Sequence, residues 1–93
     1  MVPYALPYIG SATDLTKLPS PLGQKLKNTL GAMIESQQRW LDNPANSKVD
    51  MPTYAEIFGN LQRYRSALDA LEKGRANTAE RMTIEQVLEG LGY

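Results

Sequence analysis

The side chains of this sequence that could do chemistry are carboxylates and arginines, because it contains no histidine and no cysteine. Without these two residue types the usual general base, the Cys–His or Ser–His nucleophile and the thiolate or imidazole zinc site are all missing. Asp50 and Glu56 lie near a predicted helix start and could form an acid–base pair, but a helix cap and a solvated loop residue fit the same positions. No convergent polar cluster accompanies them. We therefore predict that the protein is not an enzyme and has no catalytic residue, metal site or cofactor.

Four of the five arginines lie in the second half of the chain, and arginine is well suited to phosphate. They are Arg63, Arg65, Arg75 and Arg81. Acidic residues are interspersed among them, and the whole chain balances ten basic against ten acidic side chains. Because nucleic-acid-binding domains normally carry a basic excess, nucleic acid is an unlikely partner.

Aromatic residues offer another possible binding chemistry. Tyr54, Phe58 and Tyr64 recur at helical spacing and could stack on bases, although a stripe of this kind more often faces a core. Trp40 lies near a predicted helix end, where a tryptophan can either anchor an interface or join the core.

Two long amphipathic helices must position these residues. Ser20 as N-cap and Pro21 at the first helical position predict a helix over residues 21–42, which Asn43–Pro44 ends. Gly31 within it could permit close approach of another helix. After a polar connection that suggests two offset helices, Thr53 and Glu56 form a capping-box pattern that predicts a second helix over 54–73, with Gly74 just past its end.

A short third helix over residues 84–89 is predicted from a second capping-box pattern, Thr83 and Gln86. The preceding residues 74–82 are polar and would form either a short hairpin or one extra turn capped by Asn77 and Glu80. The fold class is therefore all-α, with a small helical domain over residues 20–93.

Residues 1–19 read as an extended arm, since prolines fix φ and disfavour helix in the residue before each. Gly10–Asp14 is predicted to be a turn or loop, and a short helical turn is possible over Thr13–Leu18. The arm carries apolar side chains that prolines keep out of a helix, so we expect it to bind another subunit; packing on its own domain and disorder are the alternatives. The residues expected to bind are Val2, Pro3, Tyr4, Leu6, Pro7, Tyr8 and Ile9, with Trp40, Leu91 and Tyr93 as further candidates.

Residues 54–91, with the stretch Tyr64–Gly74 followed by a connection and a threonine-capped helix, resemble small tailed-phage head–tail joining proteins. The resemblance implies a non-enzymatic subunit of a virion, at the neck, connector, tail or baseplate, that binds other protein subunits, including copies of itself in a ring. The alternative is a small helical regulator or inhibitor that binds another protein or DNA. The location would be the virion if the protein is phage-derived and the cytoplasm otherwise, as no signal peptide or transmembrane segment is predicted.

Overall fold

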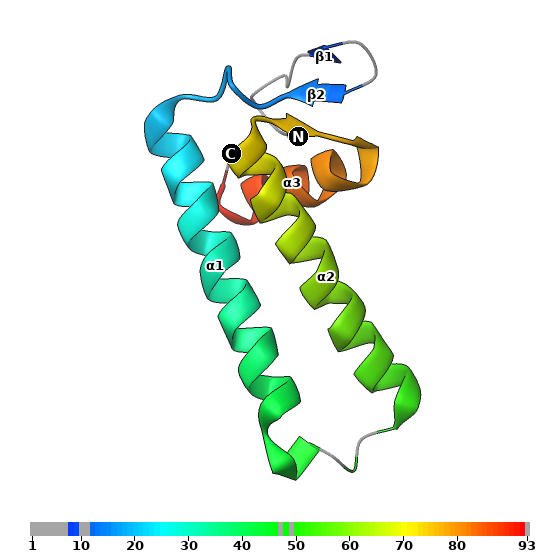
Figure 1. The fold of residues 1–93 in the computed structure, drawn as a ribbon. Coiled ribbons are helices and arrows are strands. Elements are labelled where there is room, and N and C mark those ends of the chain that lie inside the picture. The colour runs from blue at the N-terminus through cyan, green and yellow to red at the C-terminus, as the bar shows by residue number, and fades with distance from the viewer. Residues whose placement is uncertain (1–7, 10–11, 47, 49, 93) are drawn as a thin grey trace.

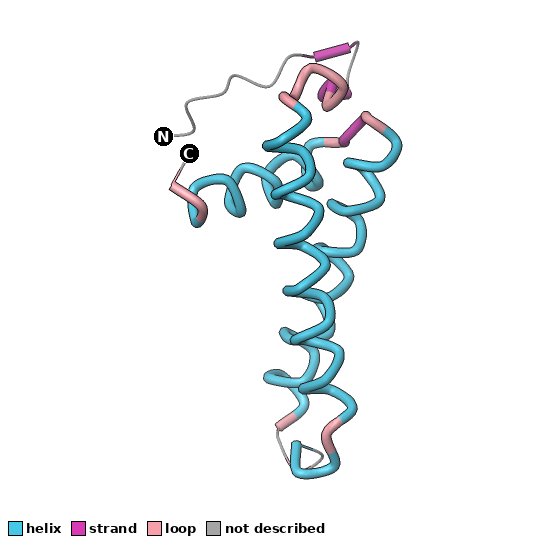
Figure 2. The backbone as a smooth tube through the Cα atoms, turned by 90° about the vertical axis from the view of Figure 1, so that its left-hand side faces the viewer, coloured by secondary structure: helices cyan, strands magenta, loops and turns pink. Residues whose placement is uncertain are grey.

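Three helices and three very short strands make up the protein in a computed structural model that describes residues 8–9, 12–46, 48 and 50–92. Helices α1 (Ser20–Asp42) and α2 (Met51–Lys73) form a long antiparallel hairpin, and α3 (Thr78–Gly90) runs across one end of it (Figures 1 and 2). A 3-10 turn, η1 (Pro44–Asn46), follows α1. The predicted all-α class is confirmed, and the two long helices lie side by side rather than offset.

The strands cover the end of the hairpin near α3 (Figure 1). They are β1 (Tyr8–Ile9), β2 (Ala12–Asp14) and β3 (Arg75–Ala76), in the antiparallel order β1-β2-β3. Thr13 pairs with Tyr8 on one side and with Ala76 on the other. Two predictions are wrong here: Thr13 and Asp14 lie in a strand, not in a loop or a helical turn. The reason is non-local, since their backbone partners lie some sixty residues away in β3.

Both long helices begin earlier than their sequence patterns predicted. Pro19, not Ser20, is the N-cap of α1, and no side chain caps this end. Asp50 is the N-cap of α2: its carboxylate accepts bonds from the Thr53 backbone N–H (3.0 Å) and from the Thr53 hydroxyl (2.9 Å). The Thr53–Glu56 capping box is therefore wrong, because Thr53 itself is already the third helical residue. Gly74 ends α2 as expected, with φ of 79°.

The third helix is more than twice the predicted length. Asn77 and Glu80 form its capping box, with Asn77 Oδ1 accepting from the Glu80 N–H (2.8 Å) and Glu80 Oε1 accepting from the Asn77 N–H (2.9 Å). The predicted Thr83–Gln86 box is wrong: Thr83 lies inside the helix and donates its hydroxyl proton to the Ala79 carbonyl (3.1 Å). Residues 75–76 were expected to belong to a short hairpin or to an extra helical turn. They instead form β3, which pairs with β2 of the predicted arm.

The hydrophobic core is concentrated at the end of the hairpin that carries α3 and the strands. The fully buried large residues there include Leu26, Leu30, Ile84 and Leu88. Leu15, which directly follows β2, is buried in the same cluster, so part of the predicted arm packs on the helical body. At the other end, residues 31–42 and 51–60 contain no buried side chain. The molecule is therefore elongated, 43 × 25 × 24 Å, with one packed end and one thin end.

Candidate partner-binding groove

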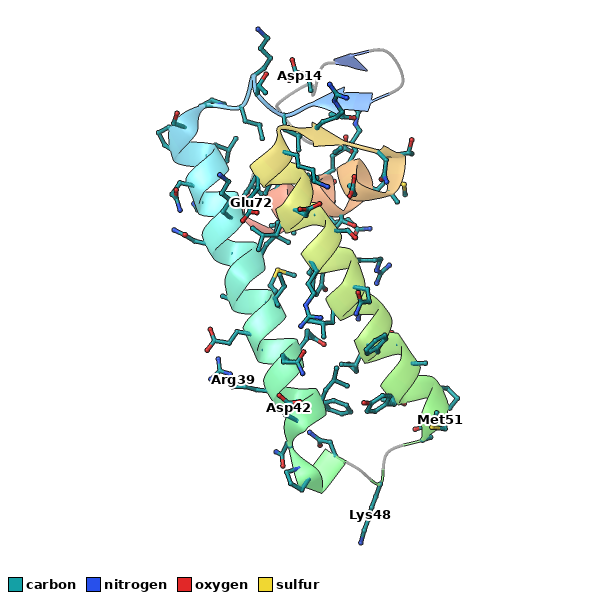
Figure 3. The ribbon with its side chains drawn as sticks, in the orientation of Figure 1. Asp14, Arg39, Asp42, Lys48, Met51 and Glu72 are labelled. Atoms are coloured by element: carbon teal, nitrogen blue, oxygen red, sulfur yellow. The ribbon has the colours of Figure 1, made fainter. Side chains whose placement is uncertain are left out.

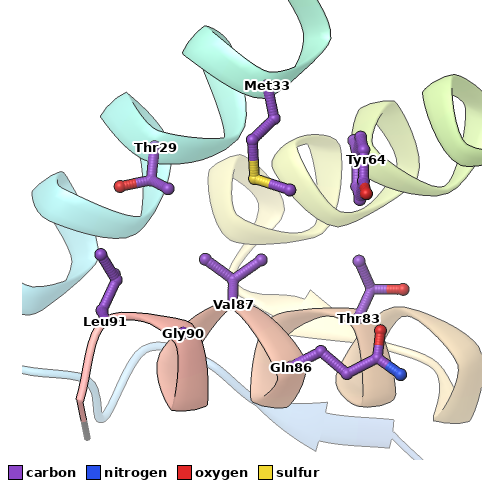
Figure 4. Close-up of a pocket in the computed structure, with 8 residues that line it drawn as sticks. All are labelled: Thr29, Met33, Tyr64, Thr83, Gln86, Val87, Gly90 and Leu91. Carbon is purple, nitrogen blue, oxygen red and sulfur yellow. The ribbon is translucent and has the colours of Figure 1, made fainter. Parts of the chain in front are cut away.

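An apolar cavity of about 250 Å³ lies where all three helices meet (Figure 4). Met33 of α1 and Tyr64 of α2 lie opposite Val87 of α3 across this space. We refer to it as the three-helix groove, and its complete lining is Thr29, Met33, Tyr64, Thr83, Gln86, Val87, Gly90 and Leu91.

The three-helix groove has no charged residue in its lining, although 22% of the whole sequence is charged. The polar residues of the lining are Thr29, Tyr64, Thr83 and Gln86. Its volume is below the roughly 300–1,000 Å³ that small-molecule and cofactor pockets occupy. The groove is therefore suited to one or two uncharged side chains of a protein segment rather than to a cofactor.

The structure places the predicted binding residues in different parts of the molecule. Leu91 lines the three-helix groove and packs against the core, so it belongs to the receiving surface. Trp40 is half-buried near the thin end, where its carbonyl accepts a bond from the Asn46 side chain (2.7 Å). Tyr8 and Ile9 form β1. The other predicted residues lie outside the described part of the chain: Val2, Pro3, Tyr4, Leu6, Pro7 and Tyr93.

Sequence reasoning missed most of the groove. The sequence points to two members of its lining, Leu91 as a candidate for partner binding and Tyr64 as a possible stacking residue. The groove comes from three helices whose packing no local pattern reveals. The absence of charge at Thr29, Met33 and Val87 is visible in the sequence, but their proximity is not.

The four arginines do not converge on one site. Arg81 forms an ion pair with Glu85 (2.6 Å), Arg65 donates to the Gln38 side chain of α1 (2.9 Å), and Arg63 donates to Asn60. Arg75 pairs with Asp14 in the β2–β3 register. Three of the four guanidinium groups thus lie beside separate acceptors, and the described residues give the phosphate hypothesis no geometric support.

The suggested acid–base pair is also not assembled. The Asp50 carboxylate caps α2, and the hydrogen bonds from Thr53 hold its pKa below the ordinary value. A lowered pKa makes a carboxyl group a poorer proton carrier at neutral pH, which is the opposite of the tuning that general acid catalysis uses. Glu56 lies exposed on α2.

A second acidic residue, Asp14, lies at the packed end and is held by hydrogen bonds (Figure 3). Its Oδ1 accepts bonds from the Thr16 hydroxyl (2.5 Å) and from the Thr16 backbone N–H (2.9 Å). These two bonds, with smaller contributions from Lys17 and Arg75, lower the pKa of Asp14. The side chain therefore fixes the turn that leads from β2 into α1.

The aromatic stripe divides between the two ends of α2. Tyr64 is half-buried against the core, as predicted. Tyr54 and Phe58 are 39% and 48% exposed, so the interpretation of the whole stripe as core is wrong for these two residues. They lie on the thin end, where α3 does not reach to cover them.

Within the described part of the chain, no group of acidic side chains is arranged to hold a metal ion, and no helix has the length and apolar character needed to cross a membrane. Comparison of the chain with family models, with curated proteins and with solved structures found no match.

Proposed function

We propose that the protein is a non-enzymatic structural adaptor, a small subunit of a multi-subunit assembly in which residues 2–7 of one copy, which precede β1, bind the three-helix groove of the next. The observation that carries this proposal is the uncharged lining of the groove. The first thirteen residues of the chain carry no charged side chain either. An uncharged segment can enter an uncharged groove without leaving an ion unpaired or desolvated.

The sequence of the arm is suited to such a groove. Val2, Tyr4 and Leu6 alternate with other residues, so an extended segment presents them on one face. Prolines restrict the backbone before binding, which reduces the entropy lost when the segment is ordered. The six residues 2–7, when extended, span up to about 20 Å, which is enough to reach a neighbouring molecule.

Binding of an arm into the groove of the next copy is a heterologous contact, and such contacts close into rings or continue as filaments. A subunit that forms a ring would use a contact of this kind. The resemblance of residues 54–91 to tailed-phage head–tail joining proteins favours a virion as the setting.

The test measures binding of a synthetic peptide of residues 1–9 to a variant that lacks residues 2–7. We expect chemical shift changes at the amides of Thr29, Val87 and Leu91 in two-dimensional NMR spectra. Gly90→Leu should abolish them. Gly90 lines the groove, and a Cβ added there meets no atom within 4 Å, so the leucine fits without disturbing the helix and occupies space that the peptide needs.

Gly59→Leu is the matched control, since it is the same change at another helical glycine with nothing within 4 Å and lies away from the groove. If the peptide leaves the groove amides unchanged, or if Gly90→Leu binds it normally, the proposed binding mode is wrong.

A further inference from the structure

A second apolar surface lies at the thin end of the hairpin, on the first turns of α2. Of the described residues, four large hydrophobic side chains are exposed, and three of them are Met51, Tyr54 and Phe58. Their exposed fractions are 75%, 39% and 48%. Steps of three and four residues place them on one face of the helix. We call this face the tip stripe.

The tip stripe is free of charge. Glu56 is the one charged residue in the segment 51–62, and it lies two positions from both Tyr54 and Phe58, on the other side of the helix. Nearby charges of α1 interact within their own helix: Glu35 pairs with Arg39 (3.5 Å), and Asp42 accepts from Gln38 (2.9 Å). These side chains of α1 have polar partners, and Asp50 beside the stripe caps α2, whereas the three apolar side chains of the stripe face solvent.

The helices beneath the stripe also lack a third packing layer. No side chain in residues 31–42 or 51–60 is buried, although several apolar ones beyond the reach of α3 are half-buried: Ile34, Trp40, Leu41 and Ile57. Helix α3 supplies the missing layer only at the packed end. Two amphipathic helices alone cannot enclose a core, and layered helices normally reach closure as bundles.

We infer that the tip stripe is the interface for a second copy of this chain, which packs its own hairpin tip against it as a two-fold dimer. A second hairpin supplies two helices at once and completes a four-helix arrangement. In a two-fold contact the same patch occurs on both sides, and an uncharged stripe meets itself without opposing like charges. The zero formal charge of the whole chain adds no net repulsion between copies.

The size of the stripe sets the strength of the association. Aromatic side chains bury about 150–250 Å² each when fully enclosed, and roughly half of each remains available here. The two aromatic side chains therefore give roughly a fifth to a third of the ~800 Å² per partner found in standard interfaces, and Met51, which is 75% exposed, adds to this area. We expect a dimer that forms reversibly with concentration, with Tyr54 and Phe58 as its central contacts.

The chain has no cysteine, so a single introduced thiol reports the contact without interference. Ala55→Cys places a thiol on an exposed position beside Tyr54, and mild oxidation should produce a covalent dimer. Met82→Cys is the matched control, because Met82 is 56% exposed but lies on α3. We expect Ala55→Cys to cross-link at least about tenfold faster, as proximity raises the effective concentration.

Phe58→Ser should weaken the dimer about tenfold or more in sedimentation equilibrium, as truncation of a central aromatic residue does. Met51→Ser provides a second variant at a more exposed position, and circular dichroism checks that both remain helical. Removal of residues 2–7 and the Gly90→Leu change should leave the Ala55→Cys cross-link unaffected, which separates this interface from arm binding.

Equal cross-linking rates for Ala55→Cys and Met82→Cys would overturn the inference. So would a native protein that stays monomeric up to about 1 mM, or a dimer that Phe58→Ser and Met51→Ser leave at full strength.

Discussion

Single residues at the junction of β2, α1 and α2 hold the packed end together. Asp14 is bonded twice by Thr16, and Leu15 directly after it donates its N–H to the Gly74 carbonyl (2.9 Å). The end of the arm and the end of α2 are therefore fixed to each other through neighbouring residues. Changes at these positions should affect stability although none of them lies in a long helix interior.

Asp14 should make stability depend on pH in the acidic range. Its folded-state pKa lies below the ordinary value of 3.8, so the folded protein binds the proton more weakly than the unfolded chain does. The stabilising contribution is present above pH 3.8 and is lost as the pH falls toward and through the lower folded-state pKa. Urea titrations at pH 7 and pH 3 should show a smaller loss of unfolding free energy for Asp14→Asn than for the native protein.

Asp50 also has a lowered pKa, so some acid sensitivity should remain in Asp14→Asn. Glu72→Gln serves as the control at an exposed carboxyl group of α2 (Figure 3). An identical pH dependence for Asp14→Asn and the native protein would show that the Thr16 bonds do not shift this group.

Gly74 should resist substitution because two physical effects coincide there. Its φ of 79° is unfavourable for residues with a side chain, and an added Cβ would lie 2.8 Å from the Thr16 methyl carbon. We expect Gly74→Ala to lower the free energy of unfolding by about 1–3 kcal/mol in urea denaturation.

The matched control for Gly74 is Gly31→Ala, in the interior of α1. A Cβ at Gly31 meets no atom within 4 Å, so the expected close helix approach at this glycine is not observed. This change should raise stability by roughly 0.5–1 kcal/mol, since alanine loses less backbone entropy in a helix. A loss of similar size for both alanine variants would contradict the argument.

At the scale of elements, the start of α3 depends on its capping box. Asn77→Ala removes the acceptor for the Glu80 N–H and should cost about 1 kcal/mol of unfolding free energy. Gln86→Ala tests the alternative start, a helix over residues 84–89 that begins with a Thr83–Gln86 capping box. Since Gln86 is exposed within α3, its replacement should change stability by less than about 0.5 kcal/mol in the same titration. A larger loss of stability for Gln86→Ala than for Asn77→Ala would contradict this start and support the predicted helix over residues 84–89.

The sequence predicts the helices well and their starts poorly, because a local pattern does not rank competing caps. Around α3, Asn77–Glu80 and Thr83–Gln86 both match a capping pattern, and pattern alone does not rank them. What selects Asn77 is the pairing of Arg75 and Ala76 with β2, which holds the chain extended directly before the helix. For α2, Asp50 takes the cap with no capping box at all.

Non-local contacts explain the other differences between sequence and structure. Strands of two or three residues carry too little pattern to be recognised, and β2 depends on partners about sixty residues away. The three-helix groove is likewise assembled by packing. By contrast, the apolar periodicity of Leu22, Leu26 and Leu30 and the position of Gly74 are local signals. The structure confirms both, since the three leucines are buried and Gly74 ends α2.

For the whole molecule, stability should be graded along the hairpin. The packed end contains every member of the hydrophobic core cluster, whereas residues 31–42 and 51–60 contribute none. Backbone hydrogen bonds open locally where few apolar contacts hold them, and only through global unfolding where the core encloses them. Protection from exchange is therefore expected to follow burial rather than helix membership.

Amide hydrogen exchange measures this gradient directly. In dilute protein, amides of residues 36–42 and 55–58 should exchange much faster than those of 24–30 and 66–72, although all four ranges lie in the same two helices. Raising the protein concentration should slow exchange at residues 55–58 in the native protein and have little effect in Phe58→Ser, because the tip stripe would be covered only in the native protein. Uniform protection along α1 and α2 in dilute solution would mean that the thin end is held as firmly as the core, and the hairpin tip would then need no partner.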